Sequence, residues 1–186
     1  MDAGTVVGVV LAAGEGRRAG GPKALRRDRG GAAWLDLAVD RLRGAGCAHV
    51  LVVLGAAAEE AHLLVPRDAE VVLSADWAEG LSASLRAGLE AARGDAALVT
   101  LVDLPDEPAT VGARLLRSAP VRPGVLARAV YEGRPGHPVL IGSAHWAAIR
   151  AGVRGDSGAR EYLVAAGVLE VECGDLASGL DHDGPR

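Results

Sequence analysis

The sequence predicts one α/β domain spanning residues 1–186, with a mostly parallel sheet flanked by helices. Apolar runs rich in valine, such as residues 5–11, are typical of strands that are buried on both faces of a parallel sheet. Segments with helical spacing of apolar residues alternate with these runs, as in α/β folds. A chain of 186 residues fits one domain that buries roughly 70% of the unfolded chain's surface.

The first half of the chain alternates regularly between strands and helices. Strands are expected over 5–11, 49–54, 70–73 and 96–102. Helices are expected over 32–42, 59–64 and 78–92. Glycines follow the first and third of these helices and mark their ends. A further helix is expected to begin within the polar segment 103–108 and to run through Leu116.

The second half of the chain is less regular. Two strands, over 124–131 and 136–141, are joined by a turn at 132–135 that contains glycine and proline. The remaining expected elements are a helix over 144–151, a helix after 155–158, a last strand over 168–173 and a polar tail.

Composition favours an enzyme that acts on small molecules. The formal net charge of -4 argues against a general nucleic-acid binder, which is usually basic. The N-terminus has no basic segment before its apolar run, and this run is far shorter than the ~20 residues of a membrane span. We therefore expect a cytoplasmic protein with no membrane partner. Cys47 and Cys173 lack metal-ligand spacing and are expected to be small buried residues.

A glycine-rich, basic loop over residues 11–23 follows the first strand. Glycines let the backbone approach a ligand closely, and the charges of Arg18 and Lys23 match phosphate oxygens. The loop fits neither common nucleotide-binding pattern well. Pro22 stands where a Walker loop has lysine, and Ala19 stands where a dinucleotide-binding fingerprint has its third glycine. The loop is a candidate site for a nucleoside triphosphate.

Asp103 follows the strand expected over 96–102. In open α/β sheets, ligands bind outside the carboxyl ends of the strands, so Asp103 and the glycine-rich loop are expected to face the same space. An aspartate at this position is also a common helix cap or loop anchor.

The segment LAAGEGRRAGGPKAL, residues 11–25, resembles the LAAGxGxRMGxxKxL signature of the MobA-like nucleotidyltransferases, with Ala19 in place of methionine. Segments 76–85, 103–105, 136–140 and 155–160 resemble further blocks of the same family, in the same order. The WxxGxxxSL, GHP and GDxGAR patterns among them are similar to the molybdenum cofactor cytidylyltransferase branch. The resemblance implies a Rossmann-like fold of the nucleotide-diphospho-sugar transferase type.

The same resemblance implies a reaction in which CMP moves from CTP to molybdopterin, or to its molybdenum-bearing form, and pyrophosphate leaves. Such chemistry needs in-line positioning and charge neutralisation. Arg18, Lys23 and Asp103 would be the catalytic residues. The implied nucleotide-binding residues are Leu11, Ala12, Ala13, Gly14, Gly16, Lys23, Ser82 and Ser84.

Mg²⁺ is the implied cofactor. Asp103 and Asp183 would be its ligands, with Asp181 nearby, because magnesium prefers carboxylate and phosphate oxygens. The tail departs from the family's DIDTPED ending, since Gly184 replaces threonine.

His137, Asp156 and Arg160 would lie on the acceptor side by the same resemblance. Asp156 and Arg160 could instead form an internal ion pair, which is the slightly favoured interpretation.

Other functions stay open at this point. The acceptor could be a sugar-1-phosphate or another phosphorylated cofactor. The protein could also be a non-catalytic nucleotide-binding partner of a molybdenum hydroxylase apoenzyme, an alternative that Ala19 and the altered tail allow. A dinucleotide-dependent oxidoreductase is less expected, because the third glycine is missing.

Overall fold

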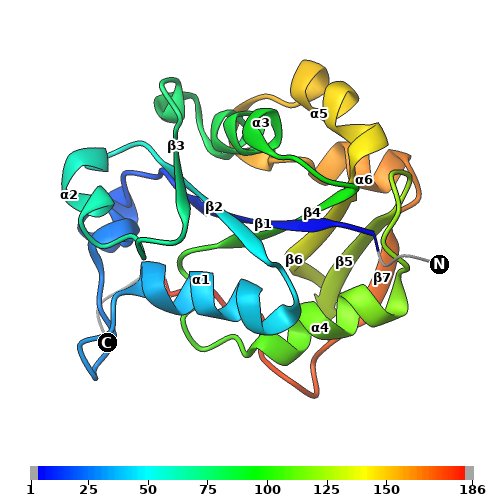
Figure 1. Ribbon diagram of the computed structural model, residues 1–186, viewed down its shortest axis with the longest axis horizontal. Coiled ribbons are helices and arrows are strands. Elements are labelled where there is room, and N and C mark those ends of the chain that lie inside the picture. Colours follow the sequence, from blue (N-terminus) through cyan, green and yellow to red (C-terminus); the bar gives the residue numbers. More distant parts are fainter. Residues whose placement is uncertain (1–3, 183–186) are drawn as a thin grey trace.

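A seven-stranded β-sheet forms the centre of the molecule in the computed structural model, which describes residues 4–182 (Figure 1). Its strands are β1 (Val6–Ala12), β2 (His49–Leu54), β3 (Glu70–Leu73), β4 (Ala96–Leu101), β5 (Leu126–Tyr131), β6 (Arg134–Gly142) and β7 (Leu169–Glu172). Their order in the sheet is β3-β2-β1-β4-β6-β5-β7. Within the described part of the chain, β6 alone runs antiparallel to its neighbours. The sheet is therefore mostly parallel, as the sequence predicts.

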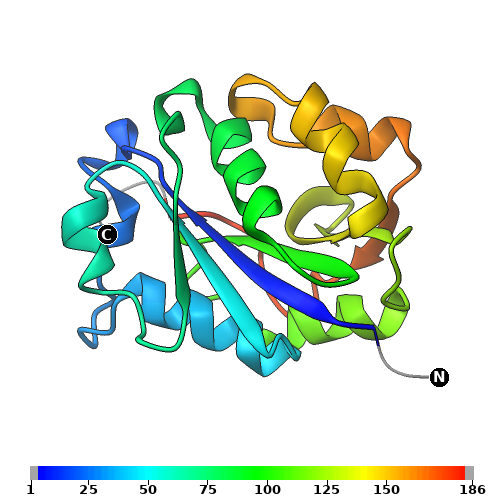
Figure 2. The same cartoon turned by 45° about the horizontal axis from the view of Figure 1, so that its top comes forward.

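Helices cover both faces of this sheet. The helices are α1 (Trp34–Ala45), α2 (Ala58–His62), α3 (Leu81–Ala91), α4 (Ala109–Ser118), α5 (Trp146–Gly152) and α6 (Arg160–Ala165). Figures 1 and 2 show α1 and α4 on one face, and α3, α5 and α6 on the other. None of the described helices has the length and apolar character needed to cross a membrane.

The core consists of two apolar layers, one on each face of the sheet. In β1, Val7 and Val9 pack into the layer beneath α3 and α5, whereas Val10 and Ala12 pack into the layer beneath α1. Successive side chains of a strand point to opposite faces, so a strand covered on both sides must be apolar throughout. This explains the unbroken valine-rich run in the sequence.

Several predicted elements begin or end elsewhere for identifiable reasons. The helix expected over 78–92 is divided at Gly80 into a short 3-10 turn, Trp77–Glu79, and α3. Gly80 has φ 107°, and a Cβ there would lie 2.2 Å from Asp156 Oδ1, so the chain must open to admit the 155–158 segment. The helix expected to start within 103–108 starts at Ala109, directly after Pro108.

The hairpin between β5 and β6 is tighter than predicted. Its turn consists of Glu132 and Gly133, whose φ angles are 53° and 74°. Two successive positive φ values are typical of the two-residue turns that match the twist of paired strands. Consequently β6 begins at Arg134, within the expected turn.

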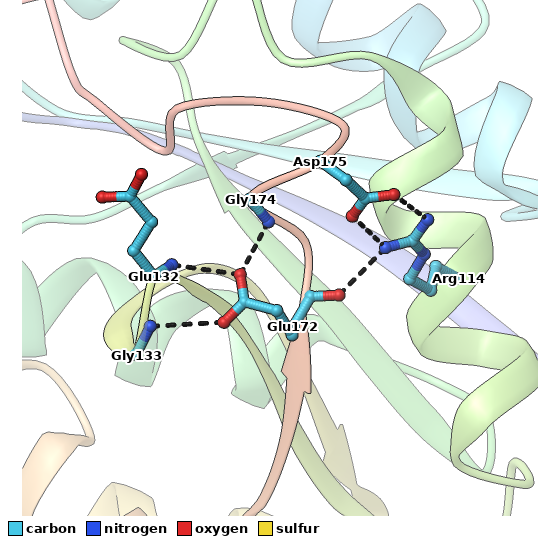
Figure 3. Close-up of polar contacts among 6 residues, drawn as sticks. All are labelled: Arg114, Glu132, Gly133, Glu172, Gly174 and Asp175. Carbon is cyan, nitrogen blue, oxygen red and sulfur yellow. Dashed lines mark hydrogen bonds and ion pairs between the residues drawn. The ribbon is translucent and has the colours of Figure 1, made fainter.

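The carboxylate of Glu172, at the end of β7, holds this turn in place (Figure 3). It accepts hydrogen bonds from the backbone N–H groups of Glu132 at 3.0 Å, Gly133 at 3.2 Å and Gly174 at 2.7 Å. These donors favour the ionised form, so the pKa of Glu172 lies below its ordinary value.

Arg114 of α4 fixes the chain that follows β7 (Figure 3). Its Nη1 donates to the carbonyl oxygen of Glu172 at 3.0 Å, and its two Nη atoms bind the carboxylate of Asp175 at 2.5 and 2.8 Å. A bidentate pair of this kind restrains orientation as well as position. The start of the tail is thus anchored to α4.

We expect Glu172→Gln to lower the melting temperature at pH 7, because the amide replaces the charged acceptor of three backbone N–H groups. A lowered pKa contributes stability that is present at neutral pH and lost as the pH falls through the folded-state value. The difference from the wild type should therefore shrink below about pH 4. Thermal unfolding followed by circular dichroism from pH 3 to pH 8 measures this.

Glu60→Gln serves as the control, since the side chain of Glu60 makes no hydrogen bond or ion pair with the described residues. A Glu172→Gln deficit that stayed constant over the whole pH range would contradict the proposed role of the carboxylate.

Candidate functional site

Two adjoining cavities lie at the edge of the sheet where β1 and β4 end. The larger, about 470 Å³, is called the loop cavity because the glycine-rich loop lines it. The smaller, about 190 Å³, is called the sheet cavity because strands β4, β5 and β6 contribute to its walls. Leu11 and Leu81 line both cavities, so the two spaces share a wall.

The loop cavity contains most of the predicted nucleotide-binding residues. Gly14 has no atom within 4 Å of the place where a Cβ would stand, so a ligand can approach the backbone there. Gly16 has φ 63°, and a Cβ on it would lie 2.0 Å from the carbonyl oxygen of Gly21. The loop therefore closes on itself in a way that requires glycine. The predicted residues that line the cavity are Leu11, Ala12, Ala13, Gly14, Gly16, Lys23 and Ser84.

Lys23 and Asp103 meet inside the loop cavity. The Nζ atom of Lys23 donates to Oδ2 of Asp103 at 2.6 Å, and both side chains are largely buried. The other carboxylate oxygen, Oδ1, is buried and accepts no hydrogen bond in the described part of the chain. A buried carboxylate oxygen is costly without a partner, so this atom is suited to a cation.

A divalent metal would find few protein ligands here. Among the described residues, no three His, Cys, Asp or Glu side chains cluster as a metal site. Magnesium is commonly held by one or two carboxylates together with substrate phosphates, so Asp103 fits a metal that arrives with a nucleotide. The other predicted ligand, Asp183, lies outside the described residues, and so does the side chain of Arg18.

The tail returns to this cavity. The backbone N–H of His182 donates to the carbonyl oxygen of Asp103 at 3.0 Å, and its Nε2 lies 2.8 Å from a carboxylate oxygen of Asp106. The ring of Trp34 stands edge-on to His182, with centroids 5.8 Å apart. Asp181 lines the loop cavity as a result. The sequence placed Asp181 near the metal site only by resemblance.

Ser82 and Ser84 have different surroundings, although the sequence predicts that both meet the nucleotide. Ser84 lines the loop cavity. Ser82 is fully buried and lines neither cavity, and its Oγ donates to the carbonyl oxygen of Gly158 at 3.4 Å. Ser82 therefore links α3 to the 155–158 segment and does not face the loop cavity.

The expected ion pair between Asp156 and Arg160 is wrong. The structure describes both residues and shows no ion pair between them. Asp156 lines the loop cavity, whereas Arg160 lines the sheet cavity. The short 3-10 turn Gly155–Ser157 and the start of α6 direct the two side chains to different spaces.

His137 lies on β6, which pairs antiparallel with β4, and lines the sheet cavity. Burial lowers the pKa of its imidazole to about 4, while the charge of Asp103 opposes this shift. The ring is therefore neutral at pH 7 and offers both a hydrogen-bond donor and an acceptor. His137 and Arg160 share this cavity.

Sequence reasoning missed Arg128 of β5, which also lines the sheet cavity. Its side chain is buried, and it pairs with Glu170 of β7. The available signal was a charged residue inside the otherwise apolar run Val125–Tyr131. Arg17 was missed as well, and it lines the loop cavity.

A buried arginine on α1 holds the segment that carries Asp103. Arg41 donates from Nη1 to the carbonyl oxygen of Leu104, and from Nη2 to that of Leu101 at 3.0 Å. These carbonyl groups flank Asp103 on both sides. The Glu107 carboxylate lies 3.4 Å from Nε of Arg41 and balances its charge.

Tyr131 extends this arrangement to the sheet cavity. Its hydroxyl donates to the carbonyl oxygen of His137 at 2.6 Å and lies 3.0 Å from Glu107. Burial raises the pKa of Glu107 above its ordinary value. One buried polar cluster, formed by Arg41, Glu107 and Tyr131, thus contacts the backbone at both Asp103 and His137.

Residues 8–170 match the model of the MobA-like NTP transferase domain. The chain belongs to this family. Membership assigns this MobA-like protein to the nucleotidyltransferases, enzymes that use a divalent metal with their nucleotide.

The chain is similar to individual proteins in sequence and to solved structures in fold. A protein of Paenarthrobacter nicotinovorans named nicotine blue oxidoreductase is 39% identical over 193 residues, which cover 96% of this chain and 92% of that protein. Rv0371c of Mycobacterium tuberculosis H37Rv, in complex with manganese, is 25% identical with a TM-score of 0.71, covering 91% and 88% of the two chains. A nucleotidyl transferase from Methanothermobacter thermautotroptrophicus has a TM-score of 0.82 at 23% identity, covering 97% and 92%, and shows the shared fold.

We expect Arg41→Met to destabilise this MobA-like domain by about 3–5 kcal/mol, because it leaves buried Glu107 without its ion-pair partner and two carbonyl groups without their donor. Urea unfolding of the wild type and the variant measures the difference. Arg93→Met, which removes an exposed arginine bound only to nearby carbonyl groups of its own segment, is the control. A loss no larger than that of the control would contradict the structural role of Arg41.

Proposed function

We propose that this enzyme transfers CMP from CTP to the phosphate of molybdopterin, or of its molybdenum-bearing form. The observation that carries the proposal is the buried Oδ1 of Asp103, which accepts no hydrogen bond from the described residues and lies beside Lys23 in the loop cavity, next to the sheet cavity that shares a wall with it. A transferase needs one space for each substrate and a charged centre between them.

CTP would bind in the loop cavity, with its phosphates against the backbone N–H groups of the glycine-rich loop. An oxygen of the acceptor phosphate attacks the α-phosphorus, the bond from this phosphorus to the bridging oxygen breaks, and pyrophosphate leaves with that oxygen. Lys23, bound to Asp103 in the described structure, would turn to the phosphates, and Arg18 would add a second positive charge. Mg²⁺, held by Asp103, the tail carboxylate of Asp183 and the phosphates, would neutralise the charge that develops.

The preference for cytidine is supported by the WxxGxxxSL, GHP and GDxGAR patterns. The backbone of Leu11, Ala12 and Ala13 would read the base, with the small side chain of Ala13 leaving room for it. His137 and Arg160 would bind the acceptor in the sheet cavity. Asp156 would lie on the donor side, because it lines the loop cavity. The product would pass to a molybdenum hydroxylase apoenzyme.

A sugar-1-phosphate or another phosphorylated cofactor would use the same donor chemistry with a different occupant of the sheet cavity. A nucleotide-binding accessory protein would bind CTP without forming product. Incubation with each of the four triphosphates and molybdopterin, followed by mass analysis of the product, separates these possibilities.

We expect Asp103→Asn to reduce pyrophosphate release from CTP and molybdopterin at least ~100-fold, because the amide binds a divalent metal poorly. The melting temperature should change little, since the amide oxygen of Asn can still accept the hydrogen bond from Lys23. Lys23→Met should cause a similar loss of turnover. Both variants are compared in a coupled pyrophosphate assay across a magnesium titration.

Asp106→Asn is the matched control, because its exposed carboxylate contacts His182 and lines neither cavity. Undiminished turnover by Asp103→Asn and Lys23→Met would overturn the assignment. Wild-type protein that binds CTP and magnesium but forms no product would point to the accessory role.

The name of the 39% identical relative favours a second candidate, an oxidoreductase that acts on nicotine blue or a related compound. Such an enzyme needs an electron donor, and a nicotinamide dinucleotide in the loop cavity would supply it. The missing third glycine of the dinucleotide fingerprint opposes this candidate.

We expect no consumption of NADH or NADPH in the presence of nicotine blue, measured by the loss of cofactor absorbance under anaerobic conditions. The same preparation should form CMP-linked product from CTP. Cofactor consumption that Asp103→Asn leaves intact, with no nucleotidyl transfer by the wild type, would establish the oxidoreductase instead.

A further inference from the structure

The two cavities differ in the charges that line them. Acidic side chains enter the loop cavity from Glu15, Asp103, Asp156 and Asp181, together with the cations Arg17 and Lys23. The described lining of the sheet cavity has no acidic residue, and its charged residues are Arg128 and Arg160. A metal–nucleotide complex suits the first environment, whereas the second attracts an anion.

Arg128 occupies a position that packing alone would give to an apolar side chain. Successive β5 residues alternate between faces, so Arg128 shares the α3 and α5 face with Leu126, whereas Ala127 packs on the α1 and α4 face. The side chain of Arg128 is 9% exposed. Burying a guanidinium is costly, so its retention at a core position calls for a partner.

Glu170 accepts hydrogen bonds from only some of the side-chain N–H groups of Arg128. It lies directly opposite Arg128 in the parallel pairing of β5 with β7. One oxygen, Oε1, accepts from Nε at 3.2 Å and from Nη2 at 2.5 Å. Nη1 makes no hydrogen bond to any residue that the structure describes. The pairing orients the guanidinium and leaves donors for a ligand in the cavity.

The rest of the sheet cavity is largely apolar. Its walls include Leu85, Val99, Val139, Ile141 and Leu163, and it holds about 190 Å³. Such walls suit a weakly polar part of a ligand. His137, neutral at pH 7, adds a hydrogen-bonding group without adding charge.

The proposed reaction places the reacting phosphate of the acceptor in a different cavity from Arg128. In the proposed reaction that phosphate must reach the α-phosphorus beside Lys23 and Asp103, which line the loop cavity and do not line the sheet cavity. An anion bound by Arg128 would then be a group of the acceptor other than this phosphate.

We propose that Arg128, oriented by Glu170, is the specificity residue of the sheet cavity and binds an anionic group of the acceptor that is distinct from its reacting phosphate. The acceptor class is thus a weakly polar body that carries a second anionic group besides its reacting phosphate. A simple sugar-1-phosphate, which has neither feature, fits the cavity poorly. This inference rests on the proposed transfer reaction for the place of the reacting phosphate.

The test is a fluorescence titration with 6-carboxypterin, a planar heterocycle with a carboxylate, and with pterin, which lacks the carboxylate. The wild type should bind 6-carboxypterin more tightly than pterin. Arg128→Met should weaken binding of 6-carboxypterin roughly 10- to 100-fold, the range of a charged hydrogen bond, and bring it to the level of pterin. Arg128→Lys should recover only part of the loss, because it lacks the planar fork.

Controls separate recognition from folding. Glu170 is 48% exposed, so it can remain hydrated in Arg128→Met, and thermal unfolding checks this. The dissociation constant of CTP with magnesium should not change. Arg150→Met removes an arginine that pairs with Glu90 outside both cavities and should bind both pterins as the wild type does.

Equal affinity of the wild type for the two pterins, no saturable binding of either, or a preference for 6-carboxypterin that persists in Arg128→Met would overturn the inference. Binding needs no turnover, so the two proposals can fail separately. Wild-type protein with Arg128-dependent binding but no nucleotidyl transfer would overturn the reaction and leave the role of Arg128 standing.

Discussion

The buried guanidinium of Arg41 is the interaction on which the arrangement of the site depends. It binds the backbone on both sides of Asp103, and Glu107 and Tyr131 link it to the backbone at His137. Replacing a buried ion pair by apolar residues is often neutral for stability, so such a cluster is better understood as a device that sets geometry. Here the cluster sets the position of Asp103 in the loop cavity relative to that of His137 in the sheet cavity.

The tail is part of the same arrangement. Arg114 anchors its start to α4, and the N–H of His182 binds the carbonyl oxygen of Asp103. The residues between these two points therefore return to the carboxyl edge of the sheet, where Asp181 enters the loop cavity. The sequence predicts only a polar tail after the last strand, but this tail contributes Asp181 to the wall of the loop cavity.

Most of the fold follows from local patterns in the sequence. The strand bounds expected for β2 and β3 match the structure, because valine-rich runs between turn residues have few other stable arrangements. The glycine-rich loop, Lys23 and Asp103 were also predictable as neighbours, since the carboxyl ends of parallel strands share one edge of a sheet. The division of the expected 78–92 helix was not predictable, because Gly80 is needed only where the distant residue Asp156 approaches.

The sequence by itself determined the α/β class, the order of most elements, the family and the residues that form the charged centre of the loop cavity. Each of these follows either from the pattern of neighbouring residues or from the fact that the carboxyl ends of parallel strands meet at one edge of a sheet. Only the tertiary structure decided that Ser82 faces Gly158, that Asp156 and Arg160 line different cavities, and that Arg128 stands in the sheet cavity beside Glu170. Contacts between residues that are remote in the chain depend on the pairing of strands and the packing of helices, which spacing along the sequence does not encode.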